Sequence, residues 1–562
     1  MKLERILPII GWLPAYRRAD AGRDLVAAVL VTVMLIPQSL AYALLAGLPP
    51  QVGLYASILP LVLYALFGSS SNLSVGPMAI VALMTAAVLA PLFEAGSEAY
   101  ITGAIILALL SGLMLILMGC MRLGFLANFL SHPVISGFMT ASALVIIASQ
   151  VKHLLGIPAS GYNLLDLLVS MGPGLGNIHA LSLVTGGGVL VFLLLARRLL
   201  PGVIGKLAPI AAVAITILLA RWLDLEQQGL AVVGFIPSGL PALSLPSLSM
   251  GASDFHLWKP MLVGALLISV VGFVESVSIA QTLAARRRQR IDPNQELIGL
   301  GAANLGAGVS SGMPVTGGLS RSVVNFDAGA RTPASSFYAA VGITAATLTL
   351  TPLIADLPKA TLAATIIVAV AGLIDLPALR RTWRYSKPDF GAMLATITLT
   401  LVHSVEAGIL AGMGLSIGLF LYRTSQPHSA VIGRVPGTEH FRNVERHKVE
   451  LCPRVTFLRI DESLYFANAR FLEDRVMELV AGQPEMTDLV LVCPAVNLVD
   501  ASAMESLETI NERLTDAGVR LHLSDVKGPV MDQLKATPLL EKLSGRVFLS
   551  AFDAWRALNT SI

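Results

Sequence analysis

Charged side chains are scarce in this sequence of 562 residues. Only 13% of the residues are Asp, Glu, Lys or Arg, whereas 55% are hydrophobic. Soluble globular proteins usually carry about 25% charged residues, so the composition argues against that class. The mean hydropathy of +0.73 indicates a membrane protein instead. The formal net charge of +3 is small, and the placement of the charges is more informative than their sum.

Cysteine is scarcer still. The three cysteines, Cys120, Cys452 and Cys493, match no metal-binding spacing and make no disulfide framework. Two of them fall in the polar C-terminal part, which suits a reducing cytosol. We therefore expect neither a metal nor a cofactor.

Signals for processing and for catalysis are also absent. Arg17, Arg18 and Arg23 lead straight into an apolar run that is too long for the core of a cleavable signal peptide. The C-terminal part has neither a Gly-rich phosphate loop nor a nucleophile–base pair. We expect a protein that is not an enzyme and that has no nucleic-acid partner.

Long apolar runs make up most of the chain. They alternate with short polar breaks up to about residue 425, and charged residues become dense from about residue 436 onward. The pattern predicts a cytoplasmic lead-in (residues 1–23), a transmembrane domain (24–425) and a soluble domain (439–562). The predicted spans are residues 24–46, 53–67, 78–92, 100–120, 133–151, 180–196, 206–222, 260–284, 294–309, 336–352, 360–379, 390–402 and 406–422.

The soluble domain alternates short apolar runs with amphipathic ones. This order is typical of an α/β fold with a largely parallel sheet. Asp500 stands where it can cap a helix that begins at Ala501. The predicted strands are residues 455–460, 488–492 and 519–523, and the predicted helices are residues 469–480, 501–517 and 528–534.

Residues 313–334, MPVTGGLSRSVVNFDAGARTPA, interrupt the apolar region with glycines and one arginine, Arg321. The segment after the glycines, residues 319–326, can form only about two helical turns, far short of the roughly 20 residues that a spanning helix needs. A short helix at membrane depth exposes free N–H groups at its start, and its dipole favours an anion there. We interpret the segment as an anion site on a half-helix, with Arg321 as its fixed charge; the alternative is an ordinary cytoplasmic helix end whose arginine meets lipid headgroups.

A second interrupted segment occupies the corresponding place in the first half of the domain. Residues 73–77, LSVGP, follow two predicted spans and open into a short apolar helix, and Pro77 suits its first turn. Broken segments in corresponding positions of two halves indicate a transporter site at an inverted-repeat interface. The halves are residues 24–222 and 260–423, and the pairing favours the site over the ordinary helix end.

Basic residues also predict the orientation. If the N-terminus is cytoplasmic, strict alternation of the spans places the basic clusters on one side of the membrane, in agreement with the positive-inside rule. The C-terminal domain is then cytoplasmic as well. The clusters are Arg122, Arg197–Arg198, Arg286–Arg288, Arg380–Arg381 and Arg423.

Two further polar residues lie within predicted spans. Gln38 follows Pro37 in the first span, which indicates a cavity wall; the alternative is a kinked helix whose glutamine bonds a neighbouring backbone. Glu275 lies in the middle of the span 260–284, where a carboxylate costs a few kcal/mol on insertion scales. Its expected partner is Arg321, either in a functional site or in a structural pair that holds two helices together.

Three stretches carry a resemblance to a known family. The run IPQSLAYALLAGLPP (residues 36–50), then VGLY (52–55) and LSVGP (73–77), resembles the SulP family of anion transporters. Its members include bacterial and plant sulfate permeases, with prestin and pendrin as animal relatives. Residues 439–562 resemble the STAS domain that follows the membrane domain in this family. The resemblance covers essentially the whole chain.

The resemblance implies fourteen membrane segments in two inverted sets of seven, with two half-helices. It also implies core and gate domains that move by an elevator-like mechanism, usually in dimers. The anion of the family lies between the starts of the third and tenth segments. The matching positions in this sequence are Gln38, Tyr42, Gly76, Pro77, Met78, Ala79, Leu319, Ser320 and Arg321.

Glu275 matches the glutamate of the proton-coupled sulfate carriers in this family. Ser502 matches a serine that is phosphorylated in anti-sigma-antagonist STAS proteins. Its surroundings, Asp-Ala-Ser-Ala, depart from the usual Asp-Ser-Ser-Gly, which puts a regulatory role in doubt.

From the residues and the resemblance together, we expect a secondary transporter of an inorganic anion in the cytoplasmic (inner) membrane, with both termini in the cytoplasm. Its expected partners are sulfate, protons, membrane lipid, a second copy of the chain and a cytosolic protein that binds the STAS domain. One alternative is a carrier or exchanger of bicarbonate, chloride or dicarboxylate. Another is an anion sensor that signals through the STAS domain without transport.

Overall fold

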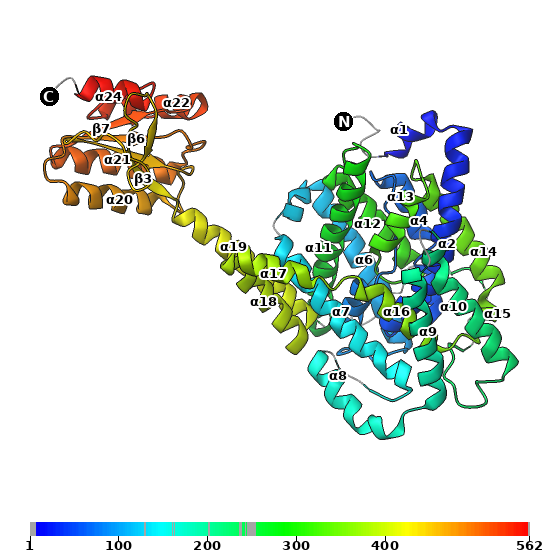
Figure 1. The fold of residues 1–562 in the computed structure, drawn as a ribbon. Coiled ribbons are helices and arrows are strands. Elements are labelled where there is room, and N and C mark those ends of the chain that lie inside the picture. Colours follow the sequence, from blue (N-terminus) through cyan, green and yellow to red (C-terminus); the bar gives the residue numbers. More distant parts are fainter. Residues whose placement is uncertain are drawn as a thin grey trace. The chain divides into compact units, whose positions relative to one another are not determined.

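Long apolar helices fill the first of two compact units, Met1–Ser416, and a six-stranded sheet lies in the second, Ile417–Ile562 (Figure 1). The structure is a computed structural model that describes residues 7–128, 131–159, 161, 163–199, 203–234, 239–241, 243 and 255–559. We describe each unit by itself.

The first half of the membrane unit contains the helices that the apolar runs predict and, in addition, the short helix α8. A four-residue helix, α1 (Ile9–Trp12), precedes them. They are α2 (Arg18–Leu45), α3 (Pro50–Tyr55), α4 (Leu59–Phe67), α5 (Ala79–Leu89), α6 (Glu98–Cys120), α7 (His132–Leu155), α8 (Leu164–Met171), α9 (Ala180–Leu199) and α10 (Val203–Trp222).

The second half repeats this order of long and short helices. Its last helix, α19, begins in the first unit and ends in the second. The helices are α11 (Phe255–Arg286), α12 (Pro293–Val309), α13 (Leu319–Asp327), α14 (Ala334–Thr349), α15 (Thr351–Ile354), α16 (Lys359–Ala371), α17 (Leu376–Tyr385), α18 (Lys387–Val402) and α19 (Val405–Ser425).

Eight helical spans of the described chain are long and apolar enough to cross a membrane, and Ala79–Leu89 and Ala208–Trp222 are shorter apolar helices. With α12, α13, α14 and α18, they account for fourteen segments. The spans predicted over residues 53–67 and 360–379 are each two helices. In the second of these, the Asp375 carboxylate accepts the N–H of Ala378 at 2.9 Å and starts a new helix within the predicted span.

Glycines allow α6 and α12 to pack with their backbones close together. A methyl group on Gly112 would lie 2.9 Å from the carbonyl oxygen of Gly301, and one on Gly301 would lie 2.8 Å from that of Gly112. Small residues at such contacts are the usual way for helices to associate in a membrane. This contact holds a helix of the first half against a helix of the second.

A buried carboxylate fixes the loop before α5. Glu296, at the start of α12, is fully buried and accepts hydrogen bonds from the hydroxyl of Tyr64 (2.7 Å), from the N–H and hydroxyl of Ser69 (2.8 and 2.6 Å) and from the N–H of Ser70 (3.0 Å). A buried charge is tolerated where donors surround it in this way. These hydrogen bonds therefore hold the loop in a fixed position against α12.

The second unit is an α/β domain with strand order β4-β3-β5-β6-β7-β8. Strands β5 to β8 are parallel, and β3 and β4 add to them antiparallel. The strands are β3 (Ser429–Arg434), β4 (Phe441–Asn443), β5 (Val455–Ile460), β6 (Asp488–Val492), β7 (Arg520–Ser524) and β8 (Val547–Phe548), and the helices are α20 (Ala469–Gly482), α21 (Ala501–Asp516), α22 (Gly528–Lys535), α23 (Leu539–Lys542) and α24 (Ala551–Asn559).

Helices cover both faces of this sheet, as a parallel sheet requires. On one face, alternate residues of β5 and β6 pack with α20, α21 and α22. On the other face, Phe457 packs against Trp555 of α24. The three predicted strands are present, whereas β3, β4 and β8 were not predicted. Because β3 pairs with β5, the sheet begins at residue 429, upstream of the domain start predicted at residue 439.

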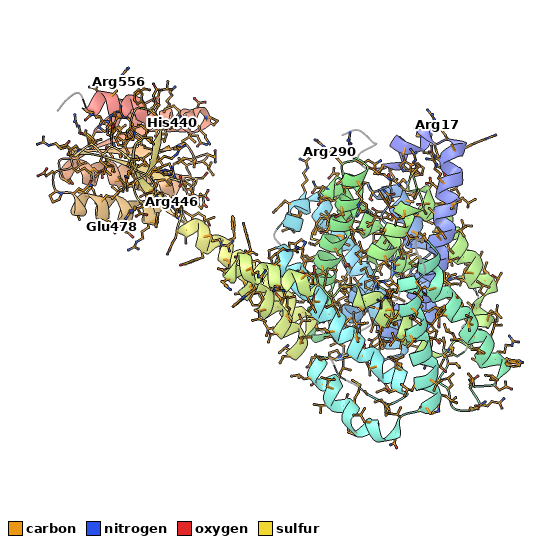
Figure 2. All side chains as sticks on the ribbon, viewed as in Figure 1. Arg17, Arg290, His440, Arg446, Glu478 and Arg556 are labelled. Atoms are coloured by element: carbon orange, nitrogen blue, oxygen red, sulfur yellow. The ribbon has the colours of Figure 1, made fainter. Side chains whose placement is uncertain are left out.

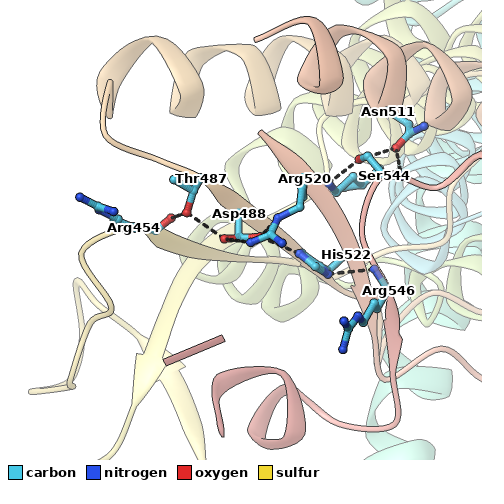
Figure 3. Close-up of polar contacts among 9 residues, drawn as sticks. Arg454, Thr487, Asp488, Asn511, Arg520, His522, Ser544 and Arg546 are labelled. Carbon is cyan, nitrogen blue, oxygen red and sulfur yellow. Dashed lines mark hydrogen bonds and ion pairs between the residues drawn. The ribbon is translucent and has the colours of Figure 1, made fainter. Parts of the chain in front are cut away.

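A buried polar network joins the starts of β6 and β7 (Figure 3). The Nε2 atom of His522 lies 2.9 Å from Asp488 Oδ1, and Arg520 Nε lies 2.8 Å from the same carboxylate. The backbone N–H of Arg546 donates to Nδ1 of His522 at 2.9 Å, so Nδ1 is the acceptor and Nε2 carries the proton. Burial lowers the pKa of His522 although Asp488 opposes this effect, and hydrogen bonds from His522 and Arg520 lower the pKa of Asp488 although burial alone would raise it.

This network predicts that acid loosens the edge of the sheet. Because the pKa of His522 is lower in the folded domain than the usual value near 6.5, its contribution to stability is present above about pH 6.5 and is lost as the pH falls through the folded pKa. Protonation of Nδ1 also removes the acceptor of the Arg546 N–H. Amide hydrogen exchange in β7 and β8 of the full chain, corrected for intrinsic rates, should rise between about pH 7 and pH 5. His440→Gln, a change at an exposed histidine, should keep this dependence, and His522→Gln should remove it.

Candidate binding site between two half-helices

Two very short strands bring the interrupted segments together. β1 (Val75–Gly76) pairs antiparallel with β2 (Thr316–Gly317), and each strand leads into a short helix, α5 or α13. The N–H of Gly318 also donates to the carbonyl oxygen of Ser74 at 3.0 Å. Because the strands are antiparallel, the starts of α5 and α13 face one another across this pair.

Neither helix start has a side-chain cap. The residues that precede α5 and α13, Met78 and Gly318, have extended backbones, and no side chain accepts a hydrogen bond from the first N–H groups of either helix. The first turn of a helix leaves such N–H groups without partners, and the helix dipole adds partial positive charge there. Two such ends directed at one point suit an anion.

Arg321 adds a full positive charge at this point. Its side chain lies in the first turn of α13 and is 1% exposed. Nη1 donates to the carbonyl oxygen of Pro77 at 2.9 Å and lies 3.4 Å from Oε1 of Gln38. Nε and Nη2 are buried and have no acceptor among the residues that the structure describes. Leaving the donors of a buried cation unpaired costs free energy. Nε and Nη2 are therefore available to donate hydrogen bonds to the oxygens of an anion.

Gly318 makes space for the guanidinium. A methyl group at this position would lie 2.7 Å from Nη2 and 2.8 Å from Cζ of Arg321, whereas one at Gly76 would meet the nearest atom, Leu35 Cδ1, at 3.4 Å and Nη2 at 3.5 Å. The first contact is too short and the second is ordinary van der Waals contact. The position of Arg321 therefore depends on glycine at residue 318 and not at residue 76.

This contact gives a prediction with an internal control. Gly318→Ala should displace the end of the Arg321 side chain and lower anion affinity about tenfold or more, because a misplaced guanidinium loses a charge-assisted hydrogen bond. Thermal stability should change little, because a flexible side chain can move aside. Gly391→Ala, at a position on α18 where an added methyl group meets nothing within 4 Å, should bind as the wild type does. Binding by isothermal titration and unfolding by scanning fluorimetry check both variants; a normal affinity in Gly318→Ala would contradict the assignment.

A cavity of about 570 Å³ opens beside the two helix starts. Gly76 and Pro77 do not line this cavity. The carbonyl oxygen of Pro77 accepts a hydrogen bond from Arg321, and Gly76 lies against the guanidinium. The predicted residues that line it are Gln38, Tyr42, Met78, Ala79, Leu319, Ser320 and Arg321. The structure thus brings together residues from α2, α5 and α13.

Sequence reasoning missed the lining residues that come from α9, α10 and α16. They include Leu193, Pro209, Thr365, Ile366 and Val370, and one charged residue, Arg197, at the end of α9. Most of these residues are apolar, and nothing in their local sequence separates them from residues that face lipid. Only the packing of distant helices identifies them.

Glu275 lies outside this cavity. It is 8% exposed on α11 and lines a separate small pocket together with Ile80, Phe138 and Val271. Both of its carboxylate oxygens are buried and have no hydrogen-bond partner, and no ion pair within the described residues joins it to Arg321. The expected direct contact is therefore absent from this structure, and the two charges interact only through space.

The residue after Glu275 connects α11 to the site. The hydroxyl of Ser276 accepts the N–H of Gly317 at 2.9 Å and lies 2.8 Å from the hydroxyl of Thr316. Thr316 in turn donates to the carbonyl oxygen of Gly272 at 2.7 Å. A displacement of α11 at Glu275 would therefore be transmitted to β2 and the start of α13 through the hydrogen bonds of Ser276.

Ser502 lies far from the cavity in sequence and belongs to the second unit. It is exposed in the first turn of α21, and Asp500 caps that helix by accepting the N–H of Ala503 at 2.9 Å. The prediction that Asp500 is a helix cap is confirmed.

The chain matches a family of known transporters. Residues 22–396 match the sulfate permease family, and residues 447–554 match the STAS domain. A probable sulfate transporter of Mycobacterium tuberculosis is 36% identical over 558 residues, which cover 98% of each chain. Sulfate transporter 4.1, chloroplastic, of Arabidopsis thaliana is 35% identical over 546 residues, which cover 93% of this chain and 78% of the relative.

Solved structures show the same fold. The structure of SLC26A9 matches with a TM-score of 0.90 and 23% identity and covers 100% of this chain and 93% of its own. The transmembrane domain of the cyanobacterial bicarbonate transporter BicA matches with a TM-score of 0.61 and 22% identity over 72% of this chain and 99% of its own. The predicted fold, an inverted-repeat membrane domain followed by an α/β STAS domain, is confirmed.

The relatives named here are transporters and not enzymes, which agrees with the expectation from the sequence. The chain therefore belongs to the sulfate permease family, and in it a STAS domain follows the membrane domain.

Proposed function

We propose that this chain is a proton-coupled secondary transporter that takes up sulfate by alternating access. The observation that carries the proposal is Arg321, a buried cation whose Nε and Nη2 atoms have no acceptor among the described residues, at the meeting point of two uncapped helix starts. The proposed anion-binding residues are Gln38, Tyr42, Gly76, Pro77, Met78, Ala79, Leu319, Ser320 and Arg321.

Sulfate suits this site by charge and shape. It carries two negative charges and four acceptor oxygens, which fit a planar guanidinium and two sets of helix N–H groups. The names of the relatives at 35–36% identity support sulfate over the alternatives. Charge and size alone would also admit bicarbonate, chloride or a dicarboxylate.

The division of the cavity between two sets of helices supports an elevator mechanism. The β1–β2 pair and the Gly318–Ser74 bond join α5 and α13 into one body that carries the anion. Helices α9, α10 and α16, which complete the cavity, contact one another and form the wall against which this body would move. Rocking or gating of one repeat against another is the general form of alternating access.

We place both termini in the cytoplasm and the protein in the cytoplasmic (inner) membrane. The start of α2, the end of α11 and the end of α13 lie together, because Asp24 accepts the N–H of Arg331 and Arg287 donates to the carbonyl oxygens of Phe326 and Ala330. Figure 2 shows Arg17 and Arg290 at this same end of the membrane unit. A basic end faces the cytoplasm.

The remaining proposals concern partners. We propose Glu275 as the proton-coupling group, a homodimer as the assembly, and a cytosolic protein as a partner of the STAS domain, with Ser502 as a candidate regulatory position because it is exposed. The proposed domains are residues 1–23, 24–425 and 439–562, with β3 suggesting an earlier start for the last.

One experiment tests the proposed function. Purified protein in proteoliposomes should accumulate radiolabelled sulfate against its gradient when the outside is made acidic, and a protonophore should abolish accumulation. An anion sensor would bind sulfate without flux. Excess bicarbonate, chloride or succinate as competitor identifies another substrate if it blocks uptake at a concentration where unlabelled sulfate does not.

A further inference from the structure

One short helix of the membrane unit has no evident role in the proposed transport step. Helix α17 (Leu376–Tyr385) follows α16 in the chain, packs against α18 and α7, and buries only Ala378; Figure 1 shows it beside α18. At ten residues it is too short to span a bilayer. Its exposed side chains therefore meet something other than the interior of this unit.

Three arginines gather on one side of α17. With about 3.6 residues per turn, Arg380, Arg381 and Arg384 fall within about a third of the helix circumference. All three are exposed, and none has a hydrogen bond or an ion pair with any described residue. Like charges at this spacing repel one another. The cluster therefore lacks its counter-charges within the chain as the structure describes it.

The neighbouring side of α17 is apolar and aromatic. Leu376 is 64% exposed and Trp383 is 50% exposed. The ring of Trp383 is held edge-on against Phe390, with centroids 4.9 Å apart, and Lys387 Nζ lies 3.1 Å from its centroid. A short helix with a cationic side beside an apolar side that contains tryptophan is typical of helices that lie in the membrane interface.

The position of α17 agrees with the basic end of the unit. Gly372, just before α17, lies beside Arg197 at the end of α9, whose Nη1 lies 3.5 Å from the carbonyl oxygen of Val368. Arg197 and Arg198 belong to the basic clusters that the positive-inside rule places on the cytoplasmic side. Anionic phospholipids on that side carry the negative charge that attracts basic segments.

We propose that α17 is a binding surface for the phosphate headgroups of anionic phospholipids in the cytoplasmic leaflet. Arg380, Arg381 and Arg384 contact the phosphates, and Leu376 and Trp383 enter the acyl boundary. The N–H of Asp375 donates to the hydroxyl of Thr140 on α7 at 3.2 Å, and α7 packs against the wall helices α9 and α16, so the start of α17 is connected to the wall through α7. If the proposed elevator operates, lipid at α17 holds this wall in place while the anion-carrying body moves.

Trp383 provides a local reporter of this lipid. The full-length protein is reconstituted in phosphatidylcholine with a minor fraction of either brominated phosphatidylglycerol or brominated phosphatidylcholine, since bromine on the acyl chain quenches nearby tryptophan. Subtracting the signal of Trp383→Phe isolates the contribution of Trp383. We expect brominated phosphatidylglycerol to quench this signal about twofold more strongly than the same fraction of brominated phosphatidylcholine, and high salt to reduce the difference.

Matched double variants test the arginines. In the double variant Arg380→Gln with Arg384→Gln, brominated phosphatidylglycerol should quench Trp383 no more strongly than brominated phosphatidylcholine does. Arg288→Gln with Arg290→Gln, which removes the same charge from another exposed basic segment, should leave the difference intact. Soluble glycerol phosphate should not compete, since the surface takes the headgroup as part of a bilayer.

Several outcomes would overturn the proposal. Equal quenching by the two lipids in the wild type would mean that the arginines face protein, either acidic residues of the soluble unit or a second copy of the chain. A difference that survives Arg380→Gln with Arg384→Gln, or that disappears equally in the control, would assign the lipid preference to another surface. None of these readouts depends on sulfate transport, so they stand apart from the proposed function.

Discussion

Replacing Arg321 by alanine is expected to abolish sulfate uptake and to leave the folded protein in the membrane. The guanidinium brings a full positive charge to the starts of α5 and α13, and its Nε and Nη2, which have no acceptor among the described residues, are the donors that sulfate oxygens would take. Each hydrogen bond to a charged group contributes about 1.5–3 kcal/mol. Loss of two such bonds lowers sulfate affinity on the order of a hundredfold or more.

The comparison with lysine separates charge from shape. Arg321→Lys should recover only part of the binding, because an ammonium group lacks the planar fork that meets two oxygens and is shorter than the guanidinium. Arg290→Ala serves as a control, since this arginine lies at the end of the unit and outside the cavity (Figure 2). Binding and uptake are measured in the same detergent and lipid preparations. Uptake by Arg321→Ala near the wild-type rate would remove Arg321 from the site.

The apolar runs predict most of the membrane helices because a spanning helix must be both long and apolar. Predictions went wrong where a local signal broke such a run. Asp375 caps a new helix within a stretch predicted as one span, and the short amphipathic helix α8 was not predicted at all. In the soluble unit, β4 and β8 contain three and two residues, too few to show a periodic pattern.

The part of the candidate site that the backbone forms, the two short helices and their starts, could be predicted from the sequence. The glycines and Pro77 show where a helix must be short, and Arg321 shows which charge it attracts. The wall from α9, α10 and α16 depends on the packing of residues more than 100 positions apart, such as Leu193 and Ala364, which belong to one buried cluster, and no local pattern marks it. The sequence likewise could not show that Glu275 would face an apolar pocket rather than Arg321.

Glu275→Gln is expected to bind sulfate with little dependence on pH and to lose uphill accumulation. In this structure the carboxyl group of Glu275 has no donor and is surrounded by Ile80, Phe138 and Val271, an environment that favours its neutral form. Arg321 is the cation whose charge acts on it through space. When a doubly charged anion occupies Arg321, that charge is neutralised, and Glu275 takes up a proton more readily.

Anion and proton then raise each other's affinity by the same factor, as linkage requires. In the wild type, sulfate affinity should fall as pH rises, by up to about tenfold per pH unit where one proton is coupled to one anion. Glutamine imitates the protonated form at every pH, so its binding curve should be flat, and sulfate exchange without a proton gradient can continue. Asp389→Asn, in the first turn of α18 and outside the two pockets, serves as the control for loss of a carboxylate and should keep the wild-type slope.

The decisive measurement is sulfate binding against pH in these three proteins, with uptake driven by a proton gradient measured in parallel. Ser276, the residue after Glu275, accepts the N–H of Gly317, so a purely structural role of Glu275 would appear as weaker binding at all pH values with an unchanged slope. Coupling through Glu275 changes the slope itself. If the wild type and Glu275→Gln lose affinity identically as pH rises, another group carries the proton, and Glu275 serves only to position α11 against β2.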